Sequence, residues 1–204
     1  MLVRQRRAVA RTASIPAPTG GWNKRDNIAD MAETDAVICK NYFPTASDVM
    51  LRLGAINWVT GFTGDTVETL MGYQSATASK LFAVVDVGAT AEIVDVTNSD
   101  TDGTPPASSV TALTNARFQH VNFSTTGGAF LLAVNGADKM RYYTGSAWDV
   151  DGGGTYTVTG VDTATWIHLN IHKRRVWGVQ KDSLLAWYLP PDSNASAAPT
   201  FDFR

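Results

Sequence analysis

Three histidines carry the side chains best suited to proton transfer or metal binding near neutral pH: His120, His168 and His172. His120 and His168 stand in one repeated pattern, aromatic-x-His-apolar-Asn-apolar, within residues 118–123 and 166–171. A repeated structural role accounts for both, so we interpret them as half-buried imidazoles and not as a metal ligand or a general base.

Basic side chains gather in two places. One is the run after His172, which predicts a solvated hairpin tip that could instead hold a phosphate or an acidic neighbour: Lys173, Arg174 and Arg175. The other is the first 25 residues, which contain six basic groups and no acid: Arg4, Arg6, Arg7, Arg11, Lys24 and Arg25. The remaining 179 residues carry 11 basic and 19 acidic groups, so a basic arm is joined to an acidic body.

Few phosphates can be neutralised by six charges, and no aromatic residue interleaves them before Trp22. We therefore interpret the arm as a partner-docking segment in preference to a DNA-binding one. All nine basic residues are candidate contacts with a partner or with DNA.

Two loops resemble calcium-binding loops at first sight. The run 98–103 places oxygen-bearing side chains at alternate positions, but its twelfth position is Ser109, where a bidentate glutamate is needed, and Pro105 and Pro106 interrupt it. The glycine-rich run 149–154 supports a metal still less. We expect both to be connecting loops, and no metal or cofactor is predicted.

No catalytic motif occurs in the sequence. A nucleophile elbow, a zinc-protease helix, a phosphate-binding loop and a dinucleotide fingerprint are all missing, and no particular pair of carboxylates is indicated. The single cysteine, Cys39, is expected to be a buried, inert thiol. We therefore expect a protein that is not an enzyme.

The elements that hold these residues form a repeat. Three strands open successive blocks at 67–73, 118–123 and 166–171, with starts 51 and 48 residues apart. Second strands are expected at 81–87, 130–134 and 176–180, and third strands at 92–97, 139–144 and 184–189. Fourth, outer strands are expected at 110–113 and 156–161.

A period near 50 residues with about four strands is typical of a β-propeller blade, although a β-sandwich is the structural competitor. We predict an all-β, propeller-like fold with blades at about 49–115, 116–163 and 164–204. Propellers need about four to eight blades. A continuation past Arg204, another chain or a different arrangement must therefore complete a ring, and a strand over 50–59 could serve as a closing outer strand.

Residues 1–48 read as an extended arm. Residues 14–48 are rich in proline and glycine and lack sustained alternation; one short helix is expected within 29–40. Arg11 interrupts the apolar stretch that a signal peptide would need, and no run approaches the ~18 apolar residues of a membrane span. The chain is expected to be made in the cytoplasm and to have no membrane segment.

Three stretches carry a family resemblance: PAPTGGWNKRDNIADMAETDAVICKNYFPTASDVMLRLG (16–54), VNGADKMRYYTGSAW (134–148) and HKRRVWGVQKDSLLAWYLP (172–190). They resemble the tail-nozzle, or packaged-DNA stabilisation, proteins of short-tailed bacteriophages and prophages. The resemblance implies a propeller-bearing subunit of the virion tail that forms a ring, typically a hexamer, below the portal and adaptor and closes the DNA exit channel. Members of this family are usually much longer, so the likeness is to their N-terminal part.

The expected function is therefore a structural one, with the same chain, the portal or adaptor and other tail proteins as partners, and double-stranded DNA passing non-specifically through the channel. The acidic body fits this role because negative charge repels phosphate and lets DNA slide. Two alternatives stay open. One is a carbohydrate-binding, glycan-degrading or receptor-binding propeller of a phage tail, and the other is an interaction propeller of cellular origin.

Overall fold

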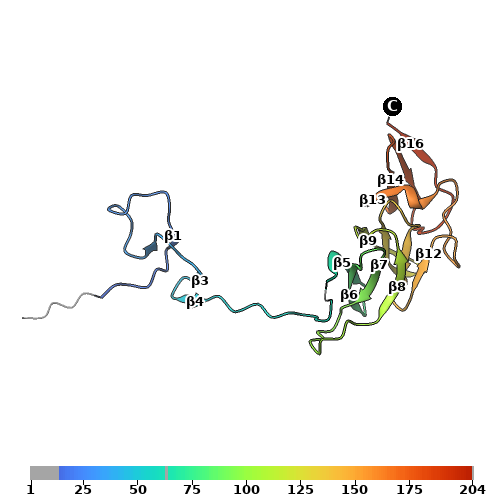
Figure 1. Cartoon of the computed structure of the whole chain (residues 1–204). Coiled ribbons are helices and arrows are strands. Elements are labelled where there is room, and N and C mark those ends of the chain that lie inside the picture. The colour runs from blue at the N-terminus through green and yellow to red at the C-terminus, as the bar shows by residue number, and fades with distance from the viewer. Residues whose placement is uncertain (1–13, 63, 204) are drawn as a thin grey trace, which may run out of the picture. The chain divides into compact units, whose positions relative to one another are not determined.

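Short β-strands joined by turns and loops build the described structure (Figure 1). The computed structural model describes residues 14–62 and 64–203. By its internal contacts the chain divides into two units, Met1–Ile56 and Asn57–Arg204.

Three four-stranded antiparallel sheets make up the second unit. The first sheet contains β5 (Thr66–Gln74), β6 (Ser79–Asp86), β7 (Ala91–Asp95) and β8 (Ser108–Leu113). The second contains β9 (Gln119–Thr125), β10 (Gly128–Val134), β11 (Arg141–Tyr143) and β12 (Trp148–Val150). The third contains β13 (Trp166–His172), β14 (Arg175–Gln180), β15 (Leu185–Tyr188) and β16 (Thr200–Asp202), after a short 3-10 turn at Thr163–Thr165. The prediction of an all-β fold with three four-stranded sheets is confirmed.

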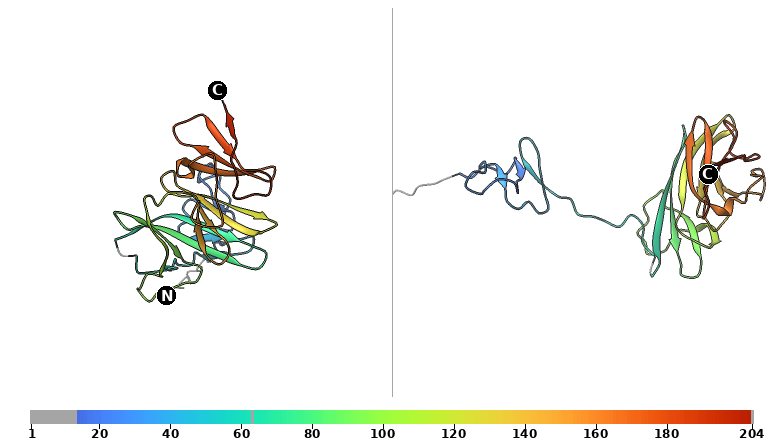
Figure 2. Two further views of the ribbon diagram at one scale, coloured as in Figure 1. Left: turned by 90° about the vertical axis from the view of Figure 1, so that its right-hand side faces the viewer. Right: turned by 90° about the horizontal axis from the view of Figure 1, so that it is seen from above.

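The three sheets stack face to face, and Figure 2 shows them in succession from green through yellow to red. Alternate residues of β10 enter different cores. Leu131 and Ala133 pack with the first sheet, around Phe82 and Ile93. Leu132 and Val134 pack with the third sheet, around Trp166. The second sheet is therefore apolar on both faces.

Polar side chains fasten the first sheet to the second. The side chain of Asn122 on β9 donates to the carbonyl of Gly72 and accepts from the amide of Gln74, at 2.7 and 3.1 Å, so one amide serves the edge of β5. The Thr69 hydroxyl donates to the Ala116 carbonyl at 2.8 Å and accepts from the Phe118 amide. These bonds satisfy backbone groups that β6 does not reach.

The far face of the first sheet is partly covered by extended chain from the same unit. Ala83, Val85, Val94 and Val96 form a small core on this face, and partly buried side chains from residues 59–62 pack on it. The Trp58 indole also donates to the Val96 carbonyl at 2.9 Å. We call residues 58–62 the strap.

The first unit is built differently. It contains two small ribbons, β1 (Gly21–Trp22) paired in parallel with β2 (Asp35–Ala36), and β3 (Tyr42–Pro44) paired antiparallel with β4 (Val49–Leu51). Within residues 14–56, the described part of this unit, no hydrophobic side chain is buried. These ribbons therefore have no hydrophobic core of their own, and a two-stranded ribbon without one is at most marginally stable.

Several expected elements were wrong. No helix forms within 29–40, because Gly20 donates to Thr34 and Asn23 to Ala36, which draws this stretch into a ribbon with residues 20–23. The expected strand over 50–59 shrinks to β4, which pairs with β3, and at its far end Val59 forms an isolated bridge with Asp100.

The outer strands also differ. The fourth strand of the second sheet is β12 and not residues 156–161, because Trp148 packs against Phe82 and Tyr143 while Val158 donates instead to Asp151 at 2.7 Å. The fourth strand of the third sheet, β16, was not predicted at all.

One close approach in the third sheet is open to test. An added Cβ at Gly178 would lie 2.3 Å from the ring of Trp166, which is fully buried, whereas one at Gly72 would meet nothing within 4 Å. We expect Gly178→Ala to lower the free energy of unfolding by about 1–3 kcal/mol through overpacking. Gly72→Ala, the matched control, is expected to change it by less than about 1 kcal/mol. Urea unfolding followed by tryptophan fluorescence measures both, and equal effects would contradict the packing described.

Candidate functional site

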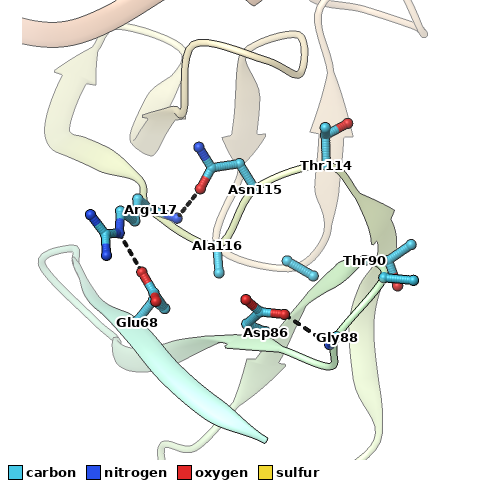
Figure 3. A pocket seen from close by; sticks show the side chains of 10 residues that line it. Glu68, Asp86, Gly88, Thr90, Thr114, Asn115, Ala116 and Arg117 are labelled. Atoms are coloured by element: carbon cyan, nitrogen blue, oxygen red, sulfur yellow. Dashed lines mark hydrogen bonds and ion pairs between the residues drawn. The ribbon is translucent and has the colours of Figure 1, made fainter.

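A polar pocket of about 180 Å³ lies at the junction of the first and second sheets (Figure 3). Glu68 and Arg117 form an ion pair across it, with 2.5 Å between Oε2 and Nε. The Asp86 carboxylate accepts from the Gly88 amide at 2.8 Å, and the Asn115 side chain accepts from the Arg117 amide at the same distance. The hydrogen bond that Arg117 donates to the Glu68 carboxylate raises the pKa of the guanidinium. Glu68 and Asn115 therefore hold Arg117 in the segment that links the sheets, and Asp86 holds the β6–β7 turn.

Beside this pocket, Asp138 clamps the same linking segment. Its carboxylate accepts from the amide and the hydroxyl of Thr114, both at 2.8 Å, and from the Asn135 side chain at 2.7 Å. Burial by itself would raise the pKa of Asp138, but the hydrogen bonds from Asn135 and Thr114 outweigh it and the pKa is lowered. The ionised carboxylate is thus the form that the fold stabilises.

The basic run after His172 forms the predicted hairpin tip, a tight two-residue turn between β13 and β14. Both turn residues, Lys173 and Arg174, have positive φ, at 49° and 60°, as a type I′ turn requires. Arg174 forms a bidentate ion pair with Asp192. Arg175 lies over the Tyr188 ring at 5.3 Å. Two of the three cations therefore have partners within the third sheet and its loops.

The N-terminal basic residues are placed only in part. Arg4, Arg6, Arg7 and Arg11 lie outside the described residues. Lys24 lies 5.6 Å from the centre of the Trp22 ring, and Arg25 pairs with Asp26 at 3.0 Å. Both basic residues are exposed.

The histidines do not share one environment. His120 is half-buried, as predicted, and burial lowers the pKa of its imidazole. It pairs with Ala133 and so faces the first sheet, whereas His168 pairs with Val179, faces away from the second sheet and is exposed. The interpretation of His168 as half-buried was wrong. The bulge between Trp166 and His168 shifts the alternation of β13 by one residue, which turns the shared pattern to the opposite face.

Among the described residues, no group of three His, Cys, Asp or Glu side chains is arranged to hold a metal ion, and no helix is long and apolar enough to cross a membrane. Cys39, expected to be buried, is partly exposed, and its thiol lies 3.5 Å from the Tyr42 carbonyl oxygen.

Sequence reasoning missed the outer face of the third sheet. Cross-strand pairing places two rows of side chains on the side away from the second sheet. One row is Asn170, Trp177 and Tyr188, and the other is His168, Val179, Ala186 and Phe201. Trp177 contacts the rings of Tyr188 and Phe201, with centroids 4.9 and 6.4 Å apart. We call these two rows the free face. Position in or beside a strand favours core packing for Trp148, Trp166, Trp177 and Trp187, but Trp177 lies on this outer face and is only half-buried.

A second apolar surface lies on the first unit. Eleven large hydrophobic side chains are exposed there: Ile15, Trp22, Ile28, Val37, Ile38, Tyr42, Phe43, Met50, Leu51, Leu53 and Ile56. Side chains of Trp22, Val37 and Ile38 line a largely apolar hollow together with Lys24, Cys39 and Lys40. Exposed apolar surface on this scale marks a place for a partner. The low core content was foreseeable from the sequence, but the exposure of each side chain was not.

Comparison with family models, with curated proteins and with solved structures finds no match for this chain.

The Asp138 clamp gives a pH prediction. Because the folded-state pKa is lowered, ionised Asp138 stabilises the fold above its unfolded pKa of about 3.9, and this contribution is lost as the pH falls through the folded-state value. We expect Asp138→Asn to reduce the free energy of unfolding by about 1 kcal/mol at pH 7. The difference from the unaltered protein should shrink below about pH 4.

Urea unfolding between pH 2.5 and 7 checks this prediction, with Asp30→Asn, an exposed carboxyl of the first unit, as the control. A difference that is independent of pH would show that Asp138 does not act through its charge.

Proposed function

We propose that the protein is a structural subunit of a short-tailed phage virion, a nozzle or connector component below the portal. It acts by assembling into a ring, of six subunits by the family likeness, that forms or closes the DNA exit channel. It is made in the bacterial cytoplasm, becomes part of the tail, and performs no chemistry.

The observation that carries this proposal is the first unit's exposed apolar surface. Phe43 and Leu51 lie on neighbouring strands of the β3–β4 ribbon and are 55% and 67% exposed, and residues 14–56 bury no hydrophobic side chain. Fully burying side chains of this kind is worth roughly 1.5–3 kcal/mol each. Because these side chains are not buried within their own unit, the same free energy can be gained when they are buried against a neighbouring subunit.

Two further features support the role. The side chains of the second unit pack against one another in its cores, and Glu68, Asn115 and Arg117 of the polar pocket are engaged in structural bonds. The sequence resemblance to tail-nozzle proteins supplies the location in the tail, the portal or adaptor as neighbours, and DNA as the passing cargo.

A second candidate function is receptor or glycan binding by a phage tail protein. The observation that favours it is the free face, where aromatic rings lie beside the polar side chains of Asn170 and His168. Aromatic surface next to hydrogen-bonding groups suits a sugar ring. We place this second because the same residue types also mark protein interfaces.

Negative-stain microscopy of the purified chain tests the main proposal. We expect rings with a central channel, and we expect Phe43→Ser/Leu51→Ser to abolish them without changing the unfolding midpoint. Val67→Ser/Leu70→Ser, which alters two similarly exposed side chains of the first sheet, is the matched control and should leave the rings intact. A monomer that binds glycan on an array would contradict the proposal and support the alternative.

A further inference from the structure

We propose that the apolar hollow on the first unit of one copy receives the acidic loop on the first unit of a second copy. The hollow is lined by Trp22, Lys24, Val37, Ile38, Cys39 and Lys40. The acidic loop is residues 27–33, which lie between the two strands of the β1–β2 ribbon. The inference rests on the proposed function, because it names the contact through which first units assemble.

The hollow combines apolar side chains with charge of one sign. Trp22 and Ile38 are 64% and 71% exposed, so the unit itself does not cover them. Among the lining residues only Lys24 and Lys40 are charged. Neither lysine has a carboxylate within ion-pair distance in residues 14–62 and 64–203. A segment that fits the hollow therefore needs an apolar side chain with negative charge beside it.

The acidic loop carries this combination. Ile28 is 73% exposed, and Asp30 and Glu33 follow it with exposed side chains. The Asp30 amide donates to the Asn27 carbonyl at 2.8 Å, which closes a tight turn around Ile28. The turn holds the apolar side chain and the first carboxylate close together before any partner binds, and such preorganisation lowers the entropic cost of binding.

The ends of the loop region are fixed by hydrogen bonds inside the unit. The Asn23 side chain donates to the carboxylates of Asp26 and Asp35, at 2.9 and 2.8 Å. These two acids therefore serve the fold of the unit. Asp30 and Glu33, by contrast, have no ion-pair partner in the part of the chain that the structure describes, so their charge is available to the lysines of a second copy.

Other exposed apolar segments match the hollow less well. The β3–β4 ribbon is flanked by Lys40 and Arg52, which would bring like charges against the lysines of the hollow. On the first sheet, Glu68 stands next to the exposed Val67, but it is already paired with Arg117. The acidic loop joins an exposed hydrophobic side chain to carboxylates without such a partner.

The hollow and the acidic loop are different surfaces of the same unit, so the contact is heterologous. Repeating it closes a ring when the rotation permits. Complementary charges set which surfaces meet and in what orientation more than they add affinity. The affinity would come from the other exposed hydrophobic side chains of the first unit, and simultaneous contacts around a ring strengthen one another.

Reversing the charges tests the contact on the full chain. Lys24→Glu/Lys40→Glu makes hollow and loop both acidic, and Asp30→Lys/Glu33→Lys makes both basic. We expect each double variant to raise the protein concentration needed for half-assembly at least about tenfold, because like charges then meet. All four substitutions in one chain restore opposite signs at the unaltered net charge, and they should restore assembly. Sedimentation velocity measures assembly, and negative-stain microscopy identifies rings.

Lys139→Glu/Lys173→Glu, which reverses two exposed lysines of the second unit, is the matched control and should leave assembly unchanged. Recovery in the fourfold variant cannot arise from misfolding, because that variant contains every change made in the double variants. Unimpaired assembly of both double variants, or failure of the fourfold variant to assemble, would refute this contact and leave the proposed function standing. Absence of rings in the unaltered protein would remove the proposed function itself.

Discussion

The structure depends on one strand that has no polar face. Leu131, Leu132, Ala133 and Val134 of β10 are all fully buried, and they alternate between two cores. A strand of this composition cannot stand at the surface, because either face would expose a row of apolar side chains. It requires a sheet on each side, and the three-sheet stack follows from that requirement.

Stacking leaves one sheet face at each end of the stack without a sheet packed on it. At the first sheet, the strap covers part of the end within the same unit, and Val67 and Leu70 stay exposed there. At the third sheet, the inner strand becomes polar through the bulge after Trp166, but Trp177, Tyr188 and Phe201 stay on the outer face. Both ends therefore keep some exposed apolar side chains. The first unit, with its unburied hydrophobic side chains, presents the complementary case of apolar chain without a sheet to cover.

The sequence predicted the repeat well and its register poorly. Continuous apolar runs such as LFAVV and FLLAV can only be central strands, so the second strand of each sheet fell close to its expected place. The shared His-x-Asn pattern of β9 and β13 suggested equivalent roles, yet a single bulge reversed the faces. A one-residue shift leaves no mark in composition, and only the cross-strand pairing reveals it. Short outer strands such as β12 and β16 were missed because three residues carry too little alternation.

The candidate surfaces divide in the same way. The basic hairpin tip was predicted from four consecutive residues, but its pairing of Arg174 with Asp192 spans 18 positions and has no local signal. Trp177 looked like a core residue because strand position predicts burial and not which face is covered. Exposure on the free face is a property of the stack as a whole, so it could not be predicted from any segment.

Hydrogen–deuterium exchange on the full chain, compared between dilute and concentrated protein, tests the central claim that the exposed apolar side chains of the first unit are covered by a neighbouring copy. The amides of β3 and β4 should exchange at once in dilute protein, and β10 should be among the slowest. On concentration, β3–β4 should gain protection. Assembly of the protein without protection of β3–β4 would contradict the account.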